Sequence, residues 1–286
     1  MLYDDKNKDE SLYHAALIYS KKIGTGTDSA NNKLRELIEK HGCFEAIYDS
    51  FFGSLLKEES HEKSLQKIKG IENVIEKINK TEFDFKVLTV KDAEFPESLR
   101  KEGNTPVIYT RGNLNLLNSK SMAVVGTRYI YPNKDRQARQ EADSVMERLV
   151  KAGYTIVSGL AKGCDTIAHK YAVEHDGKTI AVLGTPLDMS YPAENKGLQA
   201  KIAKGHLLIS QYPIGIGSYP SYFISRDKTV ASLSEGVVVI KASDNSGTIH
   251  TVKEVAKQGK KIYVLQNNFY KDHAWLREYK ENIKEI

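Results

Sequence analysis

The chain has 286 residues, of which 40% are hydrophobic and 28% are charged, and its formal net charge is +5 at pH 7. This is the composition of a globular protein, and no stretch approaches the ~20 apolar residues that a membrane-spanning helix requires. Cys43 and Cys164 are far apart and lack a Cys-x-x-Cys spacing, which argues against a disulfide framework or zinc site and favours the cytoplasm. The mildly basic charge permits a nucleic-acid partner without requiring one.

Residues 1–80 are predicted to form a small all-helical domain. Apolar residues recur at helical spacing, as Leu34, Leu37 and Ile38 do on one face. Residues 23–27 (Ile-Gly-Thr-Gly-Thr) allow a sharp turn between the early helices. Two interpretations of this turn remain open, a helix-hairpin-helix contact with DNA and a plain connection between helices.

Residues 81–120 are predicted to be a linker and an extended lead-in. The pairs Phe95-Pro96 and Thr105-Pro106 each push the residue before proline towards extended geometry. Residues 107–109 (Val-Ile-Tyr) form a short apolar run that indicates a strand ending near Arg111 and Gly112.

Residues 121–268 show apolar runs that alternate with helical patterns, which predicts a parallel sheet with helices on both faces. The fold class is therefore α/β, with a Rossmann-like sheet. A long loop rich in Gly, Pro and Tyr is expected after the fourth run, and a short helix at 269–286. The expected strands are 122–125, 154–157, 179–183, 206–209, 236–240 and 261–265, the last strand of the chain.

Glycine-bearing turns follow several of these strands, at the edge of the sheet where ligands bind in such folds. Glycine lets a phosphate approach the backbone, and the first turn of a helix favours an anion. Arg128 would contact a phosphate with two hydrogen bonds, and Lys162 would act as a mobile point charge. The candidate phosphate-binding residues in these turns are Gly126, Thr127, Arg128, Ser158, Gly159, Lys162, Gly163, Ser246, Gly247 and Thr248.

Each of these residues also has a structural interpretation. Any single glycine turn can be the tight exit that a strand needs. Asp165 is expected to cap its helix. His169 is expected to be buried and hydrogen-bonded, and Cys164 to be a small core residue.

Sequence patterns of several enzyme classes are missing. There is no Gly-x-Gly-x-x-Gly after the first strand, no Walker A sequence and no Gly-x-Ser-x-Gly elbow. Clustered carboxylates and His/Cys metal sets are also missing. We therefore expect no cofactor, no metal and no catalytic residue.

The ordered motifs resemble the DNA-processing protein A (DprA/Smf) family from about Phe95 to Leu265. They include the lead-in 106–114 and the turns 123–128 (Ala-Val-Val-Gly-Thr-Arg) and 158–165 (Ser-Gly-Leu-Ala-Lys-Gly-Cys-Asp), the latter with Ala168-His169. The segments 181–184, 187–188, 191–195, 223–228, 246–248 and 258–259 complete the likeness.

The resemblance implies a protein that binds and protects incoming single-stranded DNA, forms dimers and loads a RecA-type recombinase in natural transformation. It maps phosphate contacts to Arg128, Lys162 with Gly163, and the segment holding Arg226 and Lys228. The N-terminal helices loosely resemble the family's SAM-like extension. Aromatic residues of the Gly/Pro/Tyr loop are candidates to stack on bases, with an ordered, self-packed loop as the alternative. They are Tyr212, Tyr219, Tyr222 and Phe223, the last favoured by the resemblance.

The chain departs from the family pattern at residues 223–228. The family usually has Phe-Pro-x-Arg-Asn-Arg, whereas this chain has Phe-Ile-Ser-Arg-Asp-Lys. Asp227 therefore adds a negative charge beside the expected phosphate track, and Lys228 lacks the planar fork of arginine. From residues 269–286 we expect a short C-terminal helix rather than the winged-helix domain that many members carry.

Two other functions fit the same fold. One is an enzyme or sensor for a nucleotide-derived ligand, related to phosphoribohydrolases, although residues 245–248 (Asn-Ser-Gly-Thr) lack the Pro-Gly-Gly-x-Gly-Thr loop of those enzymes. The other is a structural protein with a vestigial pocket, which only the altered 223–228 segment supports. DNA binding without catalysis is the function that the sequence favours.

Overall fold

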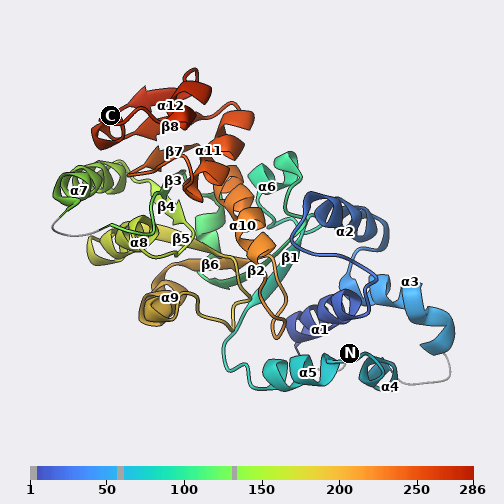
Figure 1. Cartoon of the computed structure of the whole chain (residues 1–286). Helices are drawn as coiled ribbons and strands as arrows, with labels where there is room; N and C mark the ends of the chain where they lie inside the picture. The colour runs from blue at the N-terminus through green and yellow to red at the C-terminus, as the bar shows by residue number, and fades with distance from the viewer. Residues whose placement is uncertain (1–4, 57–60, 131–133) are drawn as a thin grey trace. The chain divides into compact units, whose positions relative to one another are not determined.

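The computed structural model in Figure 1 describes residues 5–56, 61–130 and 134–286. Its contacts divide the chain into two compact units. The first is residues 1–111 with 184–189 and 209–225, and the second is residues 112–183, 190–208 and 226–286. These units combine segments that are far apart in the sequence. The domain boundaries predicted from the sequence, at residues 80, 120 and 268, are a different kind of division and stay a prediction. In the described ranges no helix is both long and apolar enough to span a membrane.

The N-terminal part of the first unit is helical, as predicted from its periodicity. Helix α1 packs on α3 and α5, and α2 packs on α3. Thr27 caps α2 because its hydroxyl accepts a hydrogen bond from the Ala30 amide at 3.2 Å. The helices are α1 (Lys6–Tyr19), α2 (Asp28–His41), α3 (Phe44–Leu56), α4 (His61–Gln66) and α5 (Ile71–Asn79).

The segment predicted as a linker and extended lead-in holds regular structure, including the strand expected at residues 107–109. Strands β1 (Lys86–Thr89) and β2 (Val107–Gly112) pair antiparallel. The helix α6 (Glu97–Glu102) lies between these two strands in the sequence, and Pro96 directly precedes its first residue. In the sequence, Pro96 indicated an extended conformation for the residue before it. The fixed φ of proline also suits the start of a helix, which is where Pro96 lies.

The second unit contains a parallel sheet in the order β5-β4-β3-β7-β8-β9. The central strands are buried along their whole length, which explains why their sequences are apolar throughout. Strand β6 (Leu207–Ser210) also forms where a strand was expected. The others are β3 (Ser121–Val125), β4 (Thr155–Ser158), β5 (Lys178–Leu183), β7 (Gly236–Val239), β8 (Lys261–Val264) and β9 (Ile283–Glu285).

Two expectations about the later part of the chain are wrong. The segment 269–286 holds a short helix, α12 (Ala274–Glu278), but also β9, so residues 261–265 are not the last strand. Three residues are too few to show a strand pattern. The expected Gly/Pro/Tyr loop ends at Pro220, where α10 (Pro220–Leu233) begins, so Phe223 to Lys228 lie on a helix.

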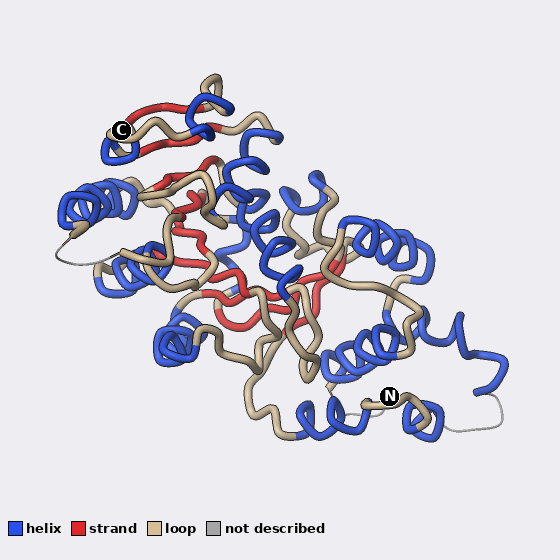
Figure 2. Tube along the Cα trace, in the orientation of Figure 1, coloured by secondary structure: helices blue, strands red, loops and turns tan. Residues whose placement is uncertain are grey.

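Helices cover both faces of the sheet in the second unit, as Figures 1 and 2 show. The helices α7 (Arg136–Lys151) and α8 (Cys164–Glu174) lie on one side, with α9 (Lys196–Gly205) beside β5, and α11 (Thr248–Lys257) lies on the other side. The chain first winds from β3 outwards to β5 and later from β7 to β9 in the opposite direction. Right-handed crossovers in opposite directions place their helices on opposite faces. The winding therefore reverses between β3 and β7, which is where ligands bind in open α/β sheets.

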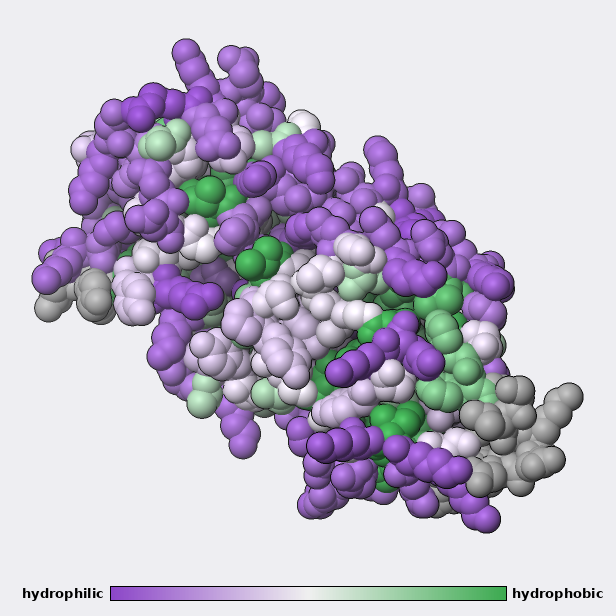
Figure 3. Space-filling model, turned by 45° about the vertical axis from the view of Figure 1, so that its right-hand side comes forward, coloured by the Kyte–Doolittle hydropathy of each residue, from purple (hydrophilic) through white to green (hydrophobic). Residues whose placement is uncertain are grey.

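On the face shown in Figure 3, hydrophobic residues reach the surface in separate areas between hydrophilic side chains. Large continuous apolar surfaces mark protein or membrane contacts. The described residues of this face therefore do not by themselves indicate such a contact, and the polar edge of the sheet is the stronger candidate for function.

Candidate functional site

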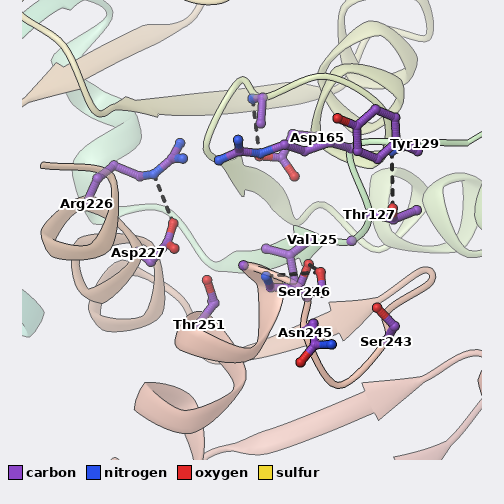
Figure 4. Close-up of a pocket in the computed structure, with 15 residues that line it drawn as sticks. Val125, Thr127, Tyr129, Asp165, Arg226, Asp227, Ser243, Asn245, Ser246 and Thr251 are labelled. Atoms are coloured by element: carbon purple, nitrogen blue, oxygen red, sulfur yellow. Dashed lines mark hydrogen bonds and ion pairs between the residues drawn. The ribbon is translucent and has the colours of Figure 1, made fainter. Parts of the chain in front are cut away.

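An open cavity of about 500 Å³ lies at the carboxyl ends of β3 and β7, where the winding of the sheet reverses (Figure 4). All of its lining residues belong to the second unit. They come from the turn after β3 (125–129), the turn and first residues after β7 (243, 245–248 and 251), and the positions 161, 165, 226 and 227. A cavity of this size accommodates a nucleotide-sized ligand.

Arg128 is the exposed cation of this cavity. Its guanidinium forms no hydrogen bond or ion pair with the residues that the structure describes. The base of its turn is fixed, because the Thr127 amide donates to the Lys241 carbonyl at 2.7 Å and the Thr127 hydroxyl accepts from the Tyr129 amide at 3.1 Å. The turn therefore holds a cation at the rim on a fixed backbone.

The opposite wall is the start of α11. The Ser246 hydroxyl donates to the Thr248 hydroxyl at 2.9 Å and accepts from the Thr248 amide at 3.3 Å. Both residues line the cavity together with Gly247, so hydroxyl groups and the positive end of a ten-residue helix border it. The structure thus brings together Gly126, Thr127, Arg128, Arg226, Ser246, Gly247 and Thr248 from the sequence-predicted set.

Gly126 and Gly163 serve the packing of two turns on each other. A Cβ on Gly126 would lie 2.6 Å from the Cys164 sulfur and 3.0 Å from the Lys241 carbonyl oxygen. Gly163 has a φ of 74°, and a Cβ there would overlap the Thr127 carbonyl oxygen. Close packing of the two turns therefore explains why both positions are glycine, and no phosphate contact is needed to explain them.

Arg226 is buried with only 3% of its surface exposed, although it lines the cavity. Its Nη1 donates to the carbonyls of Gly159 and Val182, and its Nε lies 3.0 Å from a carboxylate oxygen of Asp227 (Figure 4). A Cβ on Gly159 would overlap the guanidinium. Gly159 thus makes room for Arg226, whose charge Asp227 largely compensates.

Two carboxylates in the lining, those of the buried Asp165 and the partly buried Asp227, make the cavity partly acidic. The pKa of Asp227 is raised to about 6, chiefly by burial and also by the nearby Asp165, although Arg226 and Arg128 act in the opposite direction. Burial also raises the pKa of Asp165. Asp165 does not cap α8, because Gly163 holds that position. Its carboxylate instead accepts from the Gly159 and Ala161 amides at 3.2 and 3.3 Å and so holds the loop before the helix.

Other predicted contacts lie outside this lining. Lys162 forms an ion pair with Glu194 at 2.7 Å, and both side chains are about half exposed. The Ser158 hydroxyl is buried and donates to the Val124 carbonyl at 2.6 Å. Lys228 is partly buried on α10.

The aromatic candidates belong to the first unit, and two of them are buried. Tyr212 and Tyr222 are each 1% exposed, and their rings stack with centroids 3.7 Å apart. Tyr212 and Tyr222 thus pack inside the protein, which was the alternative to stacking on bases. Tyr219 is exposed, and its ring and that of Tyr222 are arranged edge to face. Phe223 packs so closely on Gly184 that a Cβ on Gly184 would lie 2.5 Å from the phenyl ring.

The expectations for His169 and Cys164 are confirmed. His169 is fully buried, its Nδ1 lies 2.7 Å from the Thr179 hydroxyl, and burial lowers its pKa to about 3. Cys164 is in the hydrophobic core, and burial raises the pKa of its thiol to about 12. Neither group is placed for acid–base or nucleophilic chemistry near neutral pH.

Four lining residues were not predicted from the sequence: Tyr129, Ser243, Asn245 and Thr251. Tyr129 directly follows Arg128 and is 70% exposed, and its place in that turn is the sequence feature that could have indicated it. Among the residues that the structure describes, no cluster of three His, Cys, Asp or Glu side chains could hold a metal ion.

Comparison with known proteins gives a family match over most of the second unit and part of the first. Residues 86–276 match the family described as DNA recombination-mediator protein A. The DNA processing protein DprA of Streptococcus pneumoniae is 36% identical over 182 residues, which are 63% of this chain and 63% of that protein. The match thus spans less than two thirds of that relative.

Two solved structures are also similar. The X-ray structure of DNA processing protein A from Streptococcus pneumoniae has a TM-score of 0.70 at 25% identity and covers 99% of this chain and 95% of that one. A structure of DNA processing protein A from Helicobacter pylori, described for its single-stranded DNA binding mode, has a TM-score of 0.61 at 28% identity. It covers 72% of this chain and 92% of that one.

Proposed function

Because the chain belongs to the DNA recombination-mediator protein A family, we propose that it binds single-stranded DNA in the cavity between β3 and β7. The observation that carries the proposal is the exposed Arg128 on a fixed turn, which lines the same cavity as the hydroxyls at the start of α11. A phosphate fits between such a cation and such a helix start. The single-stranded DNA described for the Helicobacter pylori relative supports the same ligand.

The proposal extends to the partners. Binding to DNA in a recombination-mediator family is consistent with loading of a RecA-type recombinase during transformation or recombination, by a homodimer in the cytoplasm. The role requires binding and positioning, and we propose no chemical step. The cavity offers arginine side chains, hydroxyl groups and the carboxylates of Asp165 and Asp227, while His169 and Cys164 are buried in the core. Phe223, Lys162 and Lys228 remain proposed DNA contacts beyond the cavity.

The test is fluorescence anisotropy of labelled poly-dT and of a duplex, across a series of salt concentrations. We expect tighter binding of the single strand, with affinity that falls as salt rises. Arg128→Ala should weaken binding at every sequence and lower the salt slope by roughly 0.7, the value for one phosphate contact on a single strand. Arg148→Ala is the matched control, because Arg148 is exposed on α7 and is not part of the cavity.

Equal affinity of Arg128→Ala and the unaltered protein for poly-dT would remove this cavity from the binding site. Incubation with nucleoside monophosphates tests the alternative of a nucleotide-cleaving enzyme. Release of free base, lost in Asp165→Asn, would favour that alternative over a purely DNA-binding role.

A further inference from the structure

A second cavity of about 320 Å³ adjoins the first in the same unit. The two cavities share Thr127 and Ser243, so these two residues form a common wall. The second cavity takes its other side chains from the start of α7, from the residues after β7 and from the segment after β8. It is therefore built at the same carboxyl edge of the sheet, one strand further along.

The lining of the second cavity is rich in cations. Lys134 and Lys271 are exposed and form no ion pair within the described ranges, and Lys241 pairs with Asp135. Asp135 is only 8% exposed, so its charge faces Lys241 rather than solvent. A negatively charged ligand thus meets two lysine side chains at this cavity that no described residue pairs with.

Each cavity also carries one highly exposed tyrosine. Tyr129 in the first cavity is 70% exposed and Tyr270 in the second is 65% exposed, the two highest values among the exposed large hydrophobic side chains of the described residues. The Tyr270 hydroxyl accepts a hydrogen bond from the Gln137 side chain at 3.0 Å, which anchors the ring by its polar end. A ring fixed at one end and exposed over its faces suits stacking on a base.

We propose that single-stranded nucleic acid passes from the first cavity over the wall of Thr127 and Ser243 into the second. Tyr129 stacks on a base in the first cavity and Tyr270 on a base in the second, while Lys134 and Lys271 contact the phosphates between and beyond them. This inference rests on the proposed function and extends the site by a second nucleotide position. Alternating cations and aromatic faces are the features that sequence-independent single-strand sites combine.

The experiment measures the affinity of oligo-dT of increasing length, from about four to about sixteen nucleotides, the range of site sizes seen for single-strand binding domains. The shortest oligonucleotides occupy one cavity, and longer ones reach both. Tyr270→Ala should leave the shortest oligonucleotide unaffected and weaken the longer ones by roughly tenfold, as expected for one lost stacking contact. Tyr270→Phe keeps the ring and loses only the hydrogen bond from Gln137, so it should bind the longer oligonucleotides clearly more tightly than Tyr270→Ala.

Lys271→Ala should lower the salt slope for the longer oligonucleotides only, and Lys284→Ala, an exposed lysine on β9, should leave it unchanged. Equal binding of Tyr270→Ala and the unaltered protein at all lengths overturns the second position, as does an equal loss at all lengths. These results are distinct from failure of the proposed function, in which the unaltered protein binds no oligonucleotide at any length. Acidic peptides that compete with long oligo-dT but not with short oligo-dT would assign the second cavity to a protein partner. This result would also overturn the inference.

Discussion

Asp227→Asn is the substitution that most directly tests the electrostatics of the first cavity. The Asp227 carboxylate lines the cavity that we assign to a phosphate, and its side chain is 18% exposed. A negative charge at this place repels a phosphate, whereas the amide of asparagine has the same size and no charge. The substitution should therefore tighten the binding of single-stranded DNA near neutral pH.

The expected magnitude follows from the position of the charge. Two unit charges about 7 Å apart repel by roughly 2 kcal/mol at an effective dielectric constant of about 20. Water in the open cavity screens part of that repulsion. We expect about 1 kcal/mol to remain, which is roughly a fivefold gain in affinity for Asp227→Asn at low salt.

The effect should depend on pH, because burial raises the pKa of Asp227 to about 6. The carboxylate is mostly ionised at pH 7.5 and mostly protonated at pH 5, so the affinity of the unaltered protein should rise as pH falls through this window. The other charged groups that act on Asp227 are Asp165, whose own pKa burial raises, and the two arginines Arg128 and Arg226. Exposed histidines are common to both proteins and cancel in the comparison.

Anisotropy titrations of both proteins with poly-dT at pH 5 and pH 7.5 give the required four affinities. The ratio between Asp227→Asn and the unaltered protein should be about five at pH 7.5 and close to one at pH 5. Thermal unfolding at both pH values controls for a change in stability: a carboxyl with a raised pKa stabilises the fold below about pH 4, and this stabilisation is lost as pH rises through 6. A ratio that is the same at both pH values, or a loss of affinity, would refute the repulsion.

Two further substitutions test other parts of the site. Gly159→Ala places a methyl group against the buried Arg226 guanidinium and should lower the free energy of unfolding by about 1–3 kcal/mol in chemical denaturation, whereas Gly247→Ala, where a Cβ meets nothing within 4 Å, should not. Unchanged stability of Gly159→Ala would contradict the close packing of these two residues. Glu194→Gln removes the partner of Lys162 and should strengthen single-strand binding by about twofold if Lys162 contacts a phosphate, since an exposed ion pair competes only weakly. No gain in Glu194→Gln at low salt would place Lys162 away from the strand.

The sequence predicted which turns lie at the ligand-binding edge of the sheet, but not which of them are neighbours. Parallel strands end at the same edge of a sheet, so the turn at Gly126 to Arg128 and the helix start at Ser246 to Thr248 were both expected at that edge. The strand order then decides the neighbours, and β3 beside β7 puts these two turns at one cavity. That order depends on crossover directions over long sequence separations, which a local pattern does not contain.

The roles of individual side chains were harder to predict, because burial decides them. Arg226 and Arg128 look alike in sequence, yet Arg226 is 3% exposed and held by two carbonyls and a carboxylate, whereas Arg128 is exposed. The aromatic candidates show the same difference, since Tyr222 is buried on a helix that was expected to be a loop. Local sequence gives the residue type at a site but not the number of neighbours around it.

The balance of charge in the first cavity determines how the strand must be held there. With Arg226 compensated by Asp227, and Asp165 also in the lining, Arg128 is the cation of that cavity which the described residues leave exposed. Hydroxyls and a helix start add dipoles but no full charge. Phosphate contacts alone then supply only a shallow salt dependence at this position, and the exposed ring of Tyr129 has to carry a correspondingly larger share of the affinity. A site of this kind favours single strands over duplexes for a physical reason, because the bases of a duplex are already stacked on each other and cannot reach the tyrosine.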